Sequence, residues 1–260
     1  YARHPEKVAD LKAEGVTFHP SISDLAGACQ CLITIVGFPR DVEEVYLAPG
    51  GSLDSARPGS FLIDMTTTSP TLARKLYEEG TKRGFHVLDA PVTGGDTGAR
   101  NGTLSILVGG KKEDFDVLQP VFQGMGTNIN YMGEAGMGQH AKMANQIMIA
   151  GTLSGLCEAL AYAQPRDWTG GSSWAPWPQG RPEAASWTPW GEILTGDDAP
   201  GFYLKHFVKD LGLAQDEARD SGLTLEVLGQ ALANCADLEA KLGDRGTQAL
   251  IHHYQNPAGR

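Results

Sequence analysis

The repeat of apolar residues changes near residue 138, and this change limits the fold more than any other feature of the chain. Before it, short apolar runs alternate with amphipathic segments, which predicts strands joined by helices in a largely parallel sheet. After it, apolar residues recur every three or four positions, which predicts helices. The expected strands are residues 31–36, 60–65, 85–89, 105–110 and 128–132, and the expected helices are 41–47, 70–82, 111–122, 138–163, 201–222, 224–242 and 247–254. The sequence thus predicts an α/β domain over residues 1–133 and an all-α domain over 134–260.

Charge and cysteine spacing argue against several classes of protein. The formal net charge is -10 and the sequence pI is about 5.1, so binding to nucleic acid is not expected. No apolar run reaches the roughly 18 residues of a membrane span, and the first residues do not resemble a signal peptide. The four cysteines, Cys29, Cys31, Cys157 and Cys235, lack metal-ligand spacing. We therefore expect free thiols, no metal site and a cytoplasmic protein.

Lys142 is the strongest candidate for chemistry. A hydride can leave a carbinol carbon only if the hydroxyl proton leaves as well, so such a reaction needs a general acid/base within hydrogen-bond reach. Lys142 is followed by the apolar Met143 and Ala144 on a predicted helix, and burial there would lower its pKa toward neutrality. The alternative is a solvated helix lysine, which is the commoner fate of a lysine taken singly.

Two further groups suit a small acid that carries a hydroxyl. Asn145 lies one helical turn after Lys142 and faces the same way, and its amide can both donate and accept. Thr93, Gly94 and Gly95 follow a predicted strand and offer a hydroxyl and successive backbone N–H groups for a carboxylate. The alternatives are an asparagine that bonds a neighbouring loop and a plain turn at the end of a strand.

Five separated blocks, in this order, resemble the β-hydroxyacid dehydrogenase family, which includes 3-hydroxyisobutyrate and 6-phosphogluconate dehydrogenases. The blocks are Asp89-Ala90-Pro91-Val92-Thr93-Gly94-Gly95, Gly102-Thr103-Leu104, Gly109-Gly110, the helix with Lys142 and Asn145, and Pro200-Gly201-Phe202 with Lys209-Asp210-Leu211. The resemblance implies a Rossmann-type doubly wound sheet followed by an all-α domain like that of 6-phosphogluconate dehydrogenase. It also implies that Lys142 is the catalytic lysine and that Thr93 stands where serine is usual.

The resemblance also implies residues that contact a nicotinamide cofactor. Phe38 and Pro39 match a loop over the dinucleotide, and Thr67 matches a second such loop. Lys209 matches a lysine near the nicotinamide and the substrate, and its neighbour Asp210 is expected to order the helix. The alternative is an exposed Lys209–Asp210 pair. Arg3 falls beside the adenosine ribose, where arginine suits a 2′-phosphate, so NADP is favoured over NAD.

Two parts of the chain depart from the family pattern. No GxGxxG motif precedes Tyr1, so we expect the Rossmann-type sheet to be incomplete, without its first strand and glycine-rich loop, about 30 residues in all. The second departure is residues 164–193, which hold all five tryptophans and five of the 15 prolines. A binding loop is one interpretation, but a structureless loop this long is unusual. Family members have helical sequence of nearly this length there, which favours a translated frameshift; an intact reading frame in the DNA would refute it.

The leading hypothesis is an oxidoreductase that transfers a hydride between NADP(H) or NAD(H) and a short β-hydroxy acid or its semialdehyde. The carboxylate site fits 3-hydroxyisobutyrate, tartronate semialdehyde and succinic semialdehyde equally well. The family resemblance implies a homo-oligomer joined by the helical domain. The alternative is a non-catalytic fragment or interaction module that keeps the fold without binding cofactor. An acyl- or phosphate-binding enzyme is less favoured, because the sequence has no GxSxG motif and no P-loop.

Overall fold

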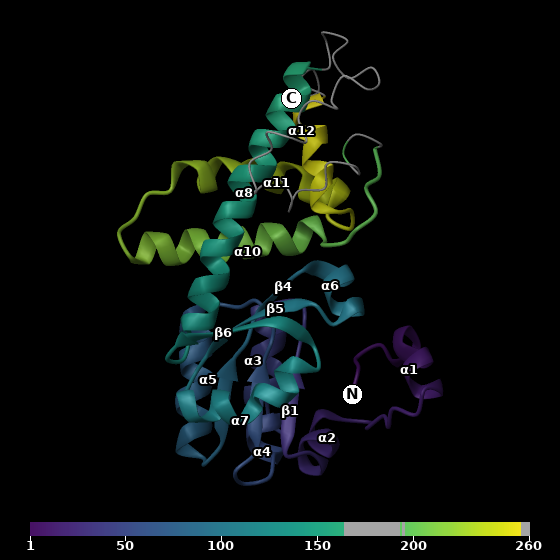
Figure 1. The fold of residues 1–260 in the computed structure, drawn as a ribbon, viewed down its shortest axis with the longest axis vertical. Helices are drawn as coiled ribbons and strands as arrows, with labels where there is room; N and C mark the ends of the chain where they lie inside the picture. The colour runs from purple at the N-terminus through teal and green to yellow at the C-terminus, as the bar shows by residue number, and fades with distance from the viewer. Residues whose placement is uncertain (164–192, 194–195, 256–260) are drawn as a thin grey trace. The chain divides into compact units, whose positions relative to one another are not determined.

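The computed structural model describes residues 1–163, 193 and 196–255, and the chain divides into two compact units (Figure 1). Unit 1 consists of Tyr1–Thr93 and Gly102–His140, and unit 2 of Gly94–Asn101 and Ala141–Arg260. Unit 1 contains the sheet with its helices, and the described part of unit 2 is helical. The predicted α/β fold followed by a helical part is therefore confirmed.

The sheet of unit 1 is mixed rather than largely parallel. Its strands are β1 (Cys31–Thr34), β2 (Phe61–Asp64), β3 (His86–Asp89), β4 (Val92–Thr93), β5 (Leu104–Gly109) and β6 (Gly126–Gly133). The pairs β1–β2, β2–β3 and β5–β6 are parallel, as predicted, but β5 runs antiparallel to both β3 and β4. The connection from β4 to β5 is short, and a parallel pair needs a crossover of a dozen or more residues, so the strand direction reverses there.

Helices cover both faces of this sheet. Successive strand residues point to opposite faces, so the neighbours Leu62 and Ile63 of β2 enter two different cores. Leu62 packs in a cluster with residues of α3 and α5, and Ile63 in a cluster with residues of α7. The helical segments of unit 1 are the short 3-10 helix η1 (Pro5–Val8), α1 (Ala9–Ala13), α2 (Ile22–Ala28), α3 (Pro39–Leu47), α4 (Ser52–Ser55), α5 (Pro70–Lys82) and α7 (Lys112–Gln123). The doubly wound arrangement that the sequence predicted is therefore present.

Local sequence sets where α5 begins. The Ser69 hydroxyl oxygen accepts a hydrogen bond from the Leu72 N–H at 3.0 Å, and Pro70 occupies the first turn, where it loses no intrahelical bond. The helix spans Pro70–Lys82, the range that the sequence predicts.

Strand β1 lies at one end of the strand order, and β2 is its partner among the described residues. Two apolar side chains of this region are exposed to solvent: Ile33 is 39% exposed, and Ile35, just beyond the strand, is 66% exposed. This edge of the sheet therefore combines open backbone with apolar surface.

Three long helices share the core of unit 2. Leu153 of α8, Phe207 and Leu211 of α10 and Leu228 of α11 are all 1% exposed or less and belong to one apolar cluster. Helix α8 starts within unit 1 and continues into unit 2. The described helical segments are α6 (Gly95–Asn101), α8 (Met137–Ala163), α10 (Leu204–Asp220), α11 (Glu226–Leu242), the 3-10 helix η6 (Thr247–Leu250) and α12 (Ile251–Gln255).

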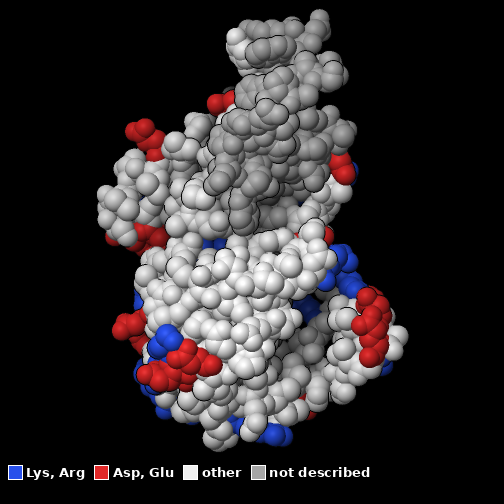
Figure 2. Space-filling view, in the orientation of Figure 1, with Lys and Arg blue, Asp and Glu red and all other residues white. Residues whose placement is uncertain are grey.

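The predicted aberrant segment 164–193 lies outside the described residues, apart from Ile193, which is buried. Across the described part of the chain, no helix is both long and apolar enough to cross a membrane. On the face drawn in Figure 2, lysine, arginine, aspartate and glutamate side chains of the described residues are scattered, and only some of the basic ones lie beside acidic ones.

Candidate active site

Lys142 lies in the second turn of α8 and is only 5% exposed, so the alternative of a solvated lysine is wrong. Burial lowers the pKa of Lys142 from its usual 10.5 to about 8. The carboxylate of Asp210 opposes this shift by attracting the ammonium, and the charge of Lys209 reinforces it. Lys142 can therefore exchange a proton near physiological pH, which an ordinary lysine cannot do.

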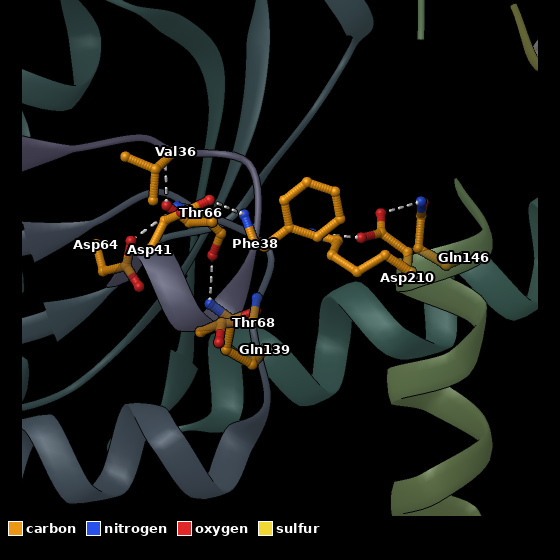
Figure 3. A network of polar contacts seen from close by, with 10 residues as sticks. Val36, Phe38, Asp41, Asp64, Thr66, Thr68, Gln139, Gln146 and Asp210 are labelled. Carbon is orange, nitrogen blue, oxygen red and sulfur yellow. Dashed lines mark hydrogen bonds and ion pairs between the residues drawn. The ribbon is translucent and has the colours of Figure 1, made fainter. Parts of the chain in front are cut away.

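Asp210, on α10, is 1% exposed and has a polar partner at each carboxylate oxygen. The Gln146 side-chain amide of α8 donates to Oδ2 at 2.7 Å, as Figure 3 shows, and Lys209 Nζ lies 2.9 Å from Oδ1. Lys209 and Asp210 thus form the ion pair that the sequence analysis gave as an alternative. The prediction that this pair is exposed is wrong. The Lys209 side chain is 12% exposed, so the two ions form a buried pair.

Asn145 lies three residues after Lys142 on α8 and is half-buried. Its Oδ1 atom is buried and accepts no hydrogen bond from the residues that the structure describes. A buried acceptor without a partner is costly unless a bound group supplies the donor. A bound substrate can supply such a donor, and the substrate-binding role of Asn145 stays a prediction with this support.

The predicted carboxylate site begins at the end of β4. Thr93 pairs with Ser105 in the sheet, and Gly94 and Gly95 follow with φ values of 128° and 63°, which favour glycine. Gly94 and Gly95 belong to unit 2, where the Asp96 N–H donates to the Gly201 carbonyl at 3.4 Å. The turn therefore needs its glycines for backbone reasons, and its role toward a carboxylate stays a prediction.

Two loops follow the carboxyl ends of β1 and β2 and are tied to each other (Figure 3). The Val36 N–H donates to Thr66 Oγ1 at 3.0 Å, and the Thr66 N–H donates to Asp64 Oδ1 at 3.0 Å. The Phe38 N–H donates to Asp41 Oδ2 at 3.0 Å, and Pro39 begins α3. Dinucleotides bind at the carboxyl ends of the strands in open α/β sheets, and Phe38, Pro39 and Thr67 lie in the loops at these ends. Their role in binding a cofactor stays a prediction.

The same loops carry polar groups of the kind that a dinucleotide uses. Thr67 is half-buried, and the Thr68 hydroxyl is buried, with no hydrogen-bond partner among residues 1–163, 193 and 196–255. Hydroxyls and loop N–H groups are common ligands of phosphate and ribose oxygens. The chemistry of the loop therefore fits a nicotinamide dinucleotide.

Gln139 joins the start of α8 to the loop after β2, a role that was not predicted from the sequence. It is 0% exposed; its Oε1 accepts from the Thr68 N–H at 3.0 Å, and its Nε2 donates to the Thr66 carbonyl at 2.8 Å (Figure 3). One side chain thus satisfies a donor and an acceptor of the loop that contains Thr67. A glutamine three residues before Lys142 was a signal that could have indicated this contact.

Asp89 holds the beginning of the same helix. Its Oδ1 accepts from the Gly136 N–H at 2.7 Å, and its Oδ2 accepts from the Gln139 N–H at 2.9 Å. Burial raises the pKa of Asp89 above its usual 3.8, while these N–H bonds oppose the shift. Asp89 therefore supplies acceptors to the N–H groups at a helix start, which have no partner within the helix.

Arg3, the predicted reader of a 2′-phosphate, lies in a bend rather than at the end of a strand. Its guanidinium contacts Asp41 Oδ1 at 3.2 Å and Glu44 Oε2 at 3.0 Å, and the side chain is 54% exposed. Asp41 also accepts from the Phe38 N–H, so Arg3 is linked to the loop that contains Phe38 and Pro39.

Comparisons with known proteins give the same family for both parts of the chain. The family model described as the NAD binding domain of 6-phosphogluconate dehydrogenase matches residues 1–133. The model described as NAD-binding of NADP-dependent 3-hydroxyisobutyrate dehydrogenase matches residues 136–254.

Individual relatives agree with these matches. A probable 3-hydroxyisobutyrate dehydrogenase-like 1, mitochondrial, of Arabidopsis thaliana is 41% identical over 256 residues, covering 96% of this chain and 76% of that protein. The 3-hydroxyisobutyrate dehydrogenase of Pseudomonas aeruginosa is 33% identical over 231 residues, covering 83% of this chain and 75% of that protein. The solved structure of Mycobacterium tuberculosis 3-hydroxyisobutyrate dehydrogenase with L-serine superposes with a TM-score of 0.79 at 29% identity. The match covers 96% of this chain and 88% of that one. The chain belongs to the family of NAD(P)-dependent β-hydroxyacid dehydrogenases that includes 3-hydroxyisobutyrate dehydrogenase.

Proposed function

We propose that this chain interconverts a short β-hydroxy acid and its semialdehyde, with NADP(H) as the preferred cofactor. The observation that carries the proposal is Lys142, a buried lysine whose pKa is lowered to about 8, on the helix that also presents Asn145. We assign cofactor binding to residues 1–133 and substrate binding to residues 134–260, together with Thr93, Gly94 and Gly95.

The nicotinamide, when bound, accepts or supplies the hydride. In oxidation, the neutral amine of Lys142 takes the proton of the substrate hydroxyl as the carbonyl forms. In reduction, the Lys142 ammonium returns a proton to the oxygen of the aldehyde. Asn145 Nδ2 donates to the oxygen of the substrate hydroxyl, whose single proton points to Lys142 in oxidation, and the Thr93 hydroxyl with the backbone N–H groups after it holds the carboxylate.

We propose 3-hydroxyisobutyrate and its semialdehyde as the first substrates to test, with L-serine and tartronate semialdehyde next. In all of them one carbon separates the carboxylate from the reacting carbon. A panel assay that follows NADPH oxidation or NADP⁺ reduction by absorbance tests the activity directly. Turnover of none of these compounds with either cofactor, by a chain that is folded by circular dichroism, would contradict the proposal.

We predict that the two directions of the reaction depend on pH in opposite ways. The Lys142 ammonium is the active form in reduction, so kcat/KM for the semialdehyde falls as the pH rises through about 8. The neutral amine is the active form in oxidation, so kcat/KM for the hydroxy acid rises over the same range. Initial rates between pH 6 and 10 measure both profiles. Two profiles that bend in the same direction would exclude Lys142 as the group that titrates.

We also predict that Arg3 sets the cofactor preference. A hydrogen bond to a charged group is worth about 1.5–3 kcal/mol, so NADPH should bind roughly tenfold or more tightly than NADH. The variant Arg3→Gln should lose this difference and bind NADH unchanged, as measured by isothermal titration calorimetry. Arg219→Gln, at an exposed arginine that pairs with Asp216 on α10, is the matched control.

The calorimetric titration also separates the proposal from the non-catalytic alternative. Equal affinity for the two cofactors would remove Arg3 as the reader of the phosphate. Binding of neither cofactor would favour the alternative of a fragment or interaction module that keeps the fold alone.

A further inference from the structure

We propose that Asp210 is a positioning residue for Lys142: its carboxylate, fixed by Gln146 and Lys209, holds the charged form of the lysine inside the protein. The inference rests on the proposed function, because the proton held in this way is the one that Lys142 donates and accepts in the reaction. All four residues belong to unit 2, on α8 and α10.

The geometry fixes the direction of the carboxylate. Gln146 Nε2 donates to Oδ2 at 2.7 Å and Lys209 Nζ lies 2.9 Å from Oδ1, so each oxygen has a different partner. Gln146 is 2% exposed and Asp210 1% exposed, so water does not compete strongly for these contacts. The hydrogen bond from Gln146 orients Oδ2, and the Lys209 ammonium attracts Oδ1 as an ion pair, although Oδ1 accepts no hydrogen bond from the described residues. The two contacts together keep the negative charge of Asp210 beside α8.

Lys142 and Gln146 lie four residues apart on α8, so their side chains leave the same face of the helix. Gln146 from this face bonds Asp210 of α10. Asp210 is also the attractive charge that acts on the Lys142 ammonium and raises the pKa that burial lowers. The glutamine therefore joins the helix that carries the lysine to the carboxylate that stabilises its charge.

The charges around Lys142 explain why the proton can leave. Lys209 pairs directly with Asp210, whose charge also attracts the Lys142 ammonium, and the charge of Lys209 lowers the pKa of Lys142. His206, one turn before Asp210 on α10, is a further titratable group on which Asp210 and Lys209 act; burial lowers its pKa, and the charges of Lys209 and Lys205 lower it further. When Lys142 loses its proton, Lys209 and Asp210 remain as a neutral pair, so the buried excess positive charge disappears. Asp210 and Lys209 thus act on the same proton in opposite directions.

The test measures the protonation of Lys142 without cofactor or substrate. Lysine labelled with carbon-13 at Cε is followed by NMR over a pH series, and the Lys142 signal is identified by its loss in Lys142→Met. In Asp210→Asn we expect the pKa of Lys142 to fall by at least about one pH unit, because an opposite charge nearby shifts a pKa by 1–3 units. In Lys209→Met we expect it to rise. Asp244→Asn, at an exposed carboxylate that pairs with Lys205, makes the same change of net charge and should leave it unmoved.

The two variants distinguish positioning from a general effect on folding. A loosened structure would expose Lys142 to water and move its pKa up toward 10.5 in both variants, whereas opposite shifts require the specific charges. An unchanged or raised pKa of Lys142 in Asp210→Asn would overturn the proposal. If Asp210→Asn does not fold, Asp210→Glu decides, and a pKa of Lys142 that is unchanged or raised in that variant overturns the proposal.

Activity assays of the same variants keep this inference separate from the proposed function. In Asp210→Asn the bend in kcat/KM for reduction should move to lower pH together with the NMR pKa, and Asp210→Glu should move it part of the way back. The expected NMR shifts without any dehydrogenase turnover would leave Asp210 as the partner of Lys142 and remove the proposed reaction. Dehydrogenase turnover with an unshifted NMR pKa of Lys142 would support the proposed reaction and remove Asp210 as the positioning residue.

Discussion

Replacing Lys142 by methionine is expected to lower kcat at pH 7 by roughly 10²- to 10⁴-fold, the usual contribution of a positioned general acid/base. Methionine has a similar length and keeps the apolar contacts of a side chain that is 5% exposed, but it can neither donate nor accept the proton. Because the cofactor loops lie in another part of the chain, the affinity for NADPH should change little. Steady-state kinetics in both directions and a calorimetric titration measure the two effects.

The same variant should be more stable than the parent protein. The pKa of Lys142 is about 8 in the folded protein and 10.5 by its ordinary value, so the folded state binds fewer protons between these pH values. The cost of burying the charge is therefore fully present below pH 8 and is relieved as the pH rises toward 10.5. Each pKa unit corresponds to about 1.36 kcal/mol, so Lys142→Met should gain on the order of 3 kcal/mol at pH 7.

Urea unfolding of both proteins at pH 7 measures this gain, and the exposed Lys241→Met serves as the control with no expected change. A gain in stability together with a loss of turnover excludes unfolding as the reason for the loss. If Lys142→Met kept the parent turnover, Lys142 would not be the catalytic residue.

Replacing Gly138 by alanine is expected to destabilise the protein by about 3 kcal/mol or more, at the upper end of overpacking effects. A Cβ at this position would lie 2.3 Å from the Leu107 carbonyl oxygen and 2.8 Å from Asp89 Oδ2. Leu107 is part of β5, whose backbone cannot move without disturbing the sheet, and Asp89 already bonds the start of α8. The midpoint of urea or thermal unfolding reports the effect.

Gly155 provides the matched control on the same helix. A Cβ there would meet no heavy atom of the described residues within 4 Å, and the position is exposed. Gly155→Ala should therefore raise the stability by up to about 1 kcal/mol, because alanine is the better helix former. Equal effects of the two substitutions would mean that α8 does not pack against Leu107 and Asp89 as the structure describes.

Periodicity and caps predicted most elements of the fold, because these signals act within a few residues. Helix α5 was predicted at its observed bounds, since Ser69 and Pro70 specify its first turn. The antiparallel direction of β5 was not predicted, because it depends on how a short connection reverses the chain rather than on the pattern of the strand itself. Helix α6 was also missed, since Gly95–Asn101 carries no apolar repeat.

The candidate site was predictable where its residues share one helix and not where they meet across the fold. Lys142 and Asn145 are three residues apart, and this spacing alone places them on one face of a helix. The contacts of Gln146 with Asp210 and of Gln139 with Thr66 and Thr68 join segments more than sixty residues apart. Such contacts follow from tertiary packing. Their local signs in the sequence are the two glutamines at helical spacing from Lys142, Gln139 before it and Gln146 after it.

The edge strand β1 also affects how the chain behaves in solution. An open strand edge with exposed isoleucines is a template on which a second chain can add a strand. The formal net charge of -10 opposes such pairing, because the chains repel one another. Salt shortens the range of this repulsion to about 10 Å at 0.1 M. We therefore expect the colloidal stability of the protein to fall as the ionic strength rises, and dilute, low-salt buffers to keep it dispersed.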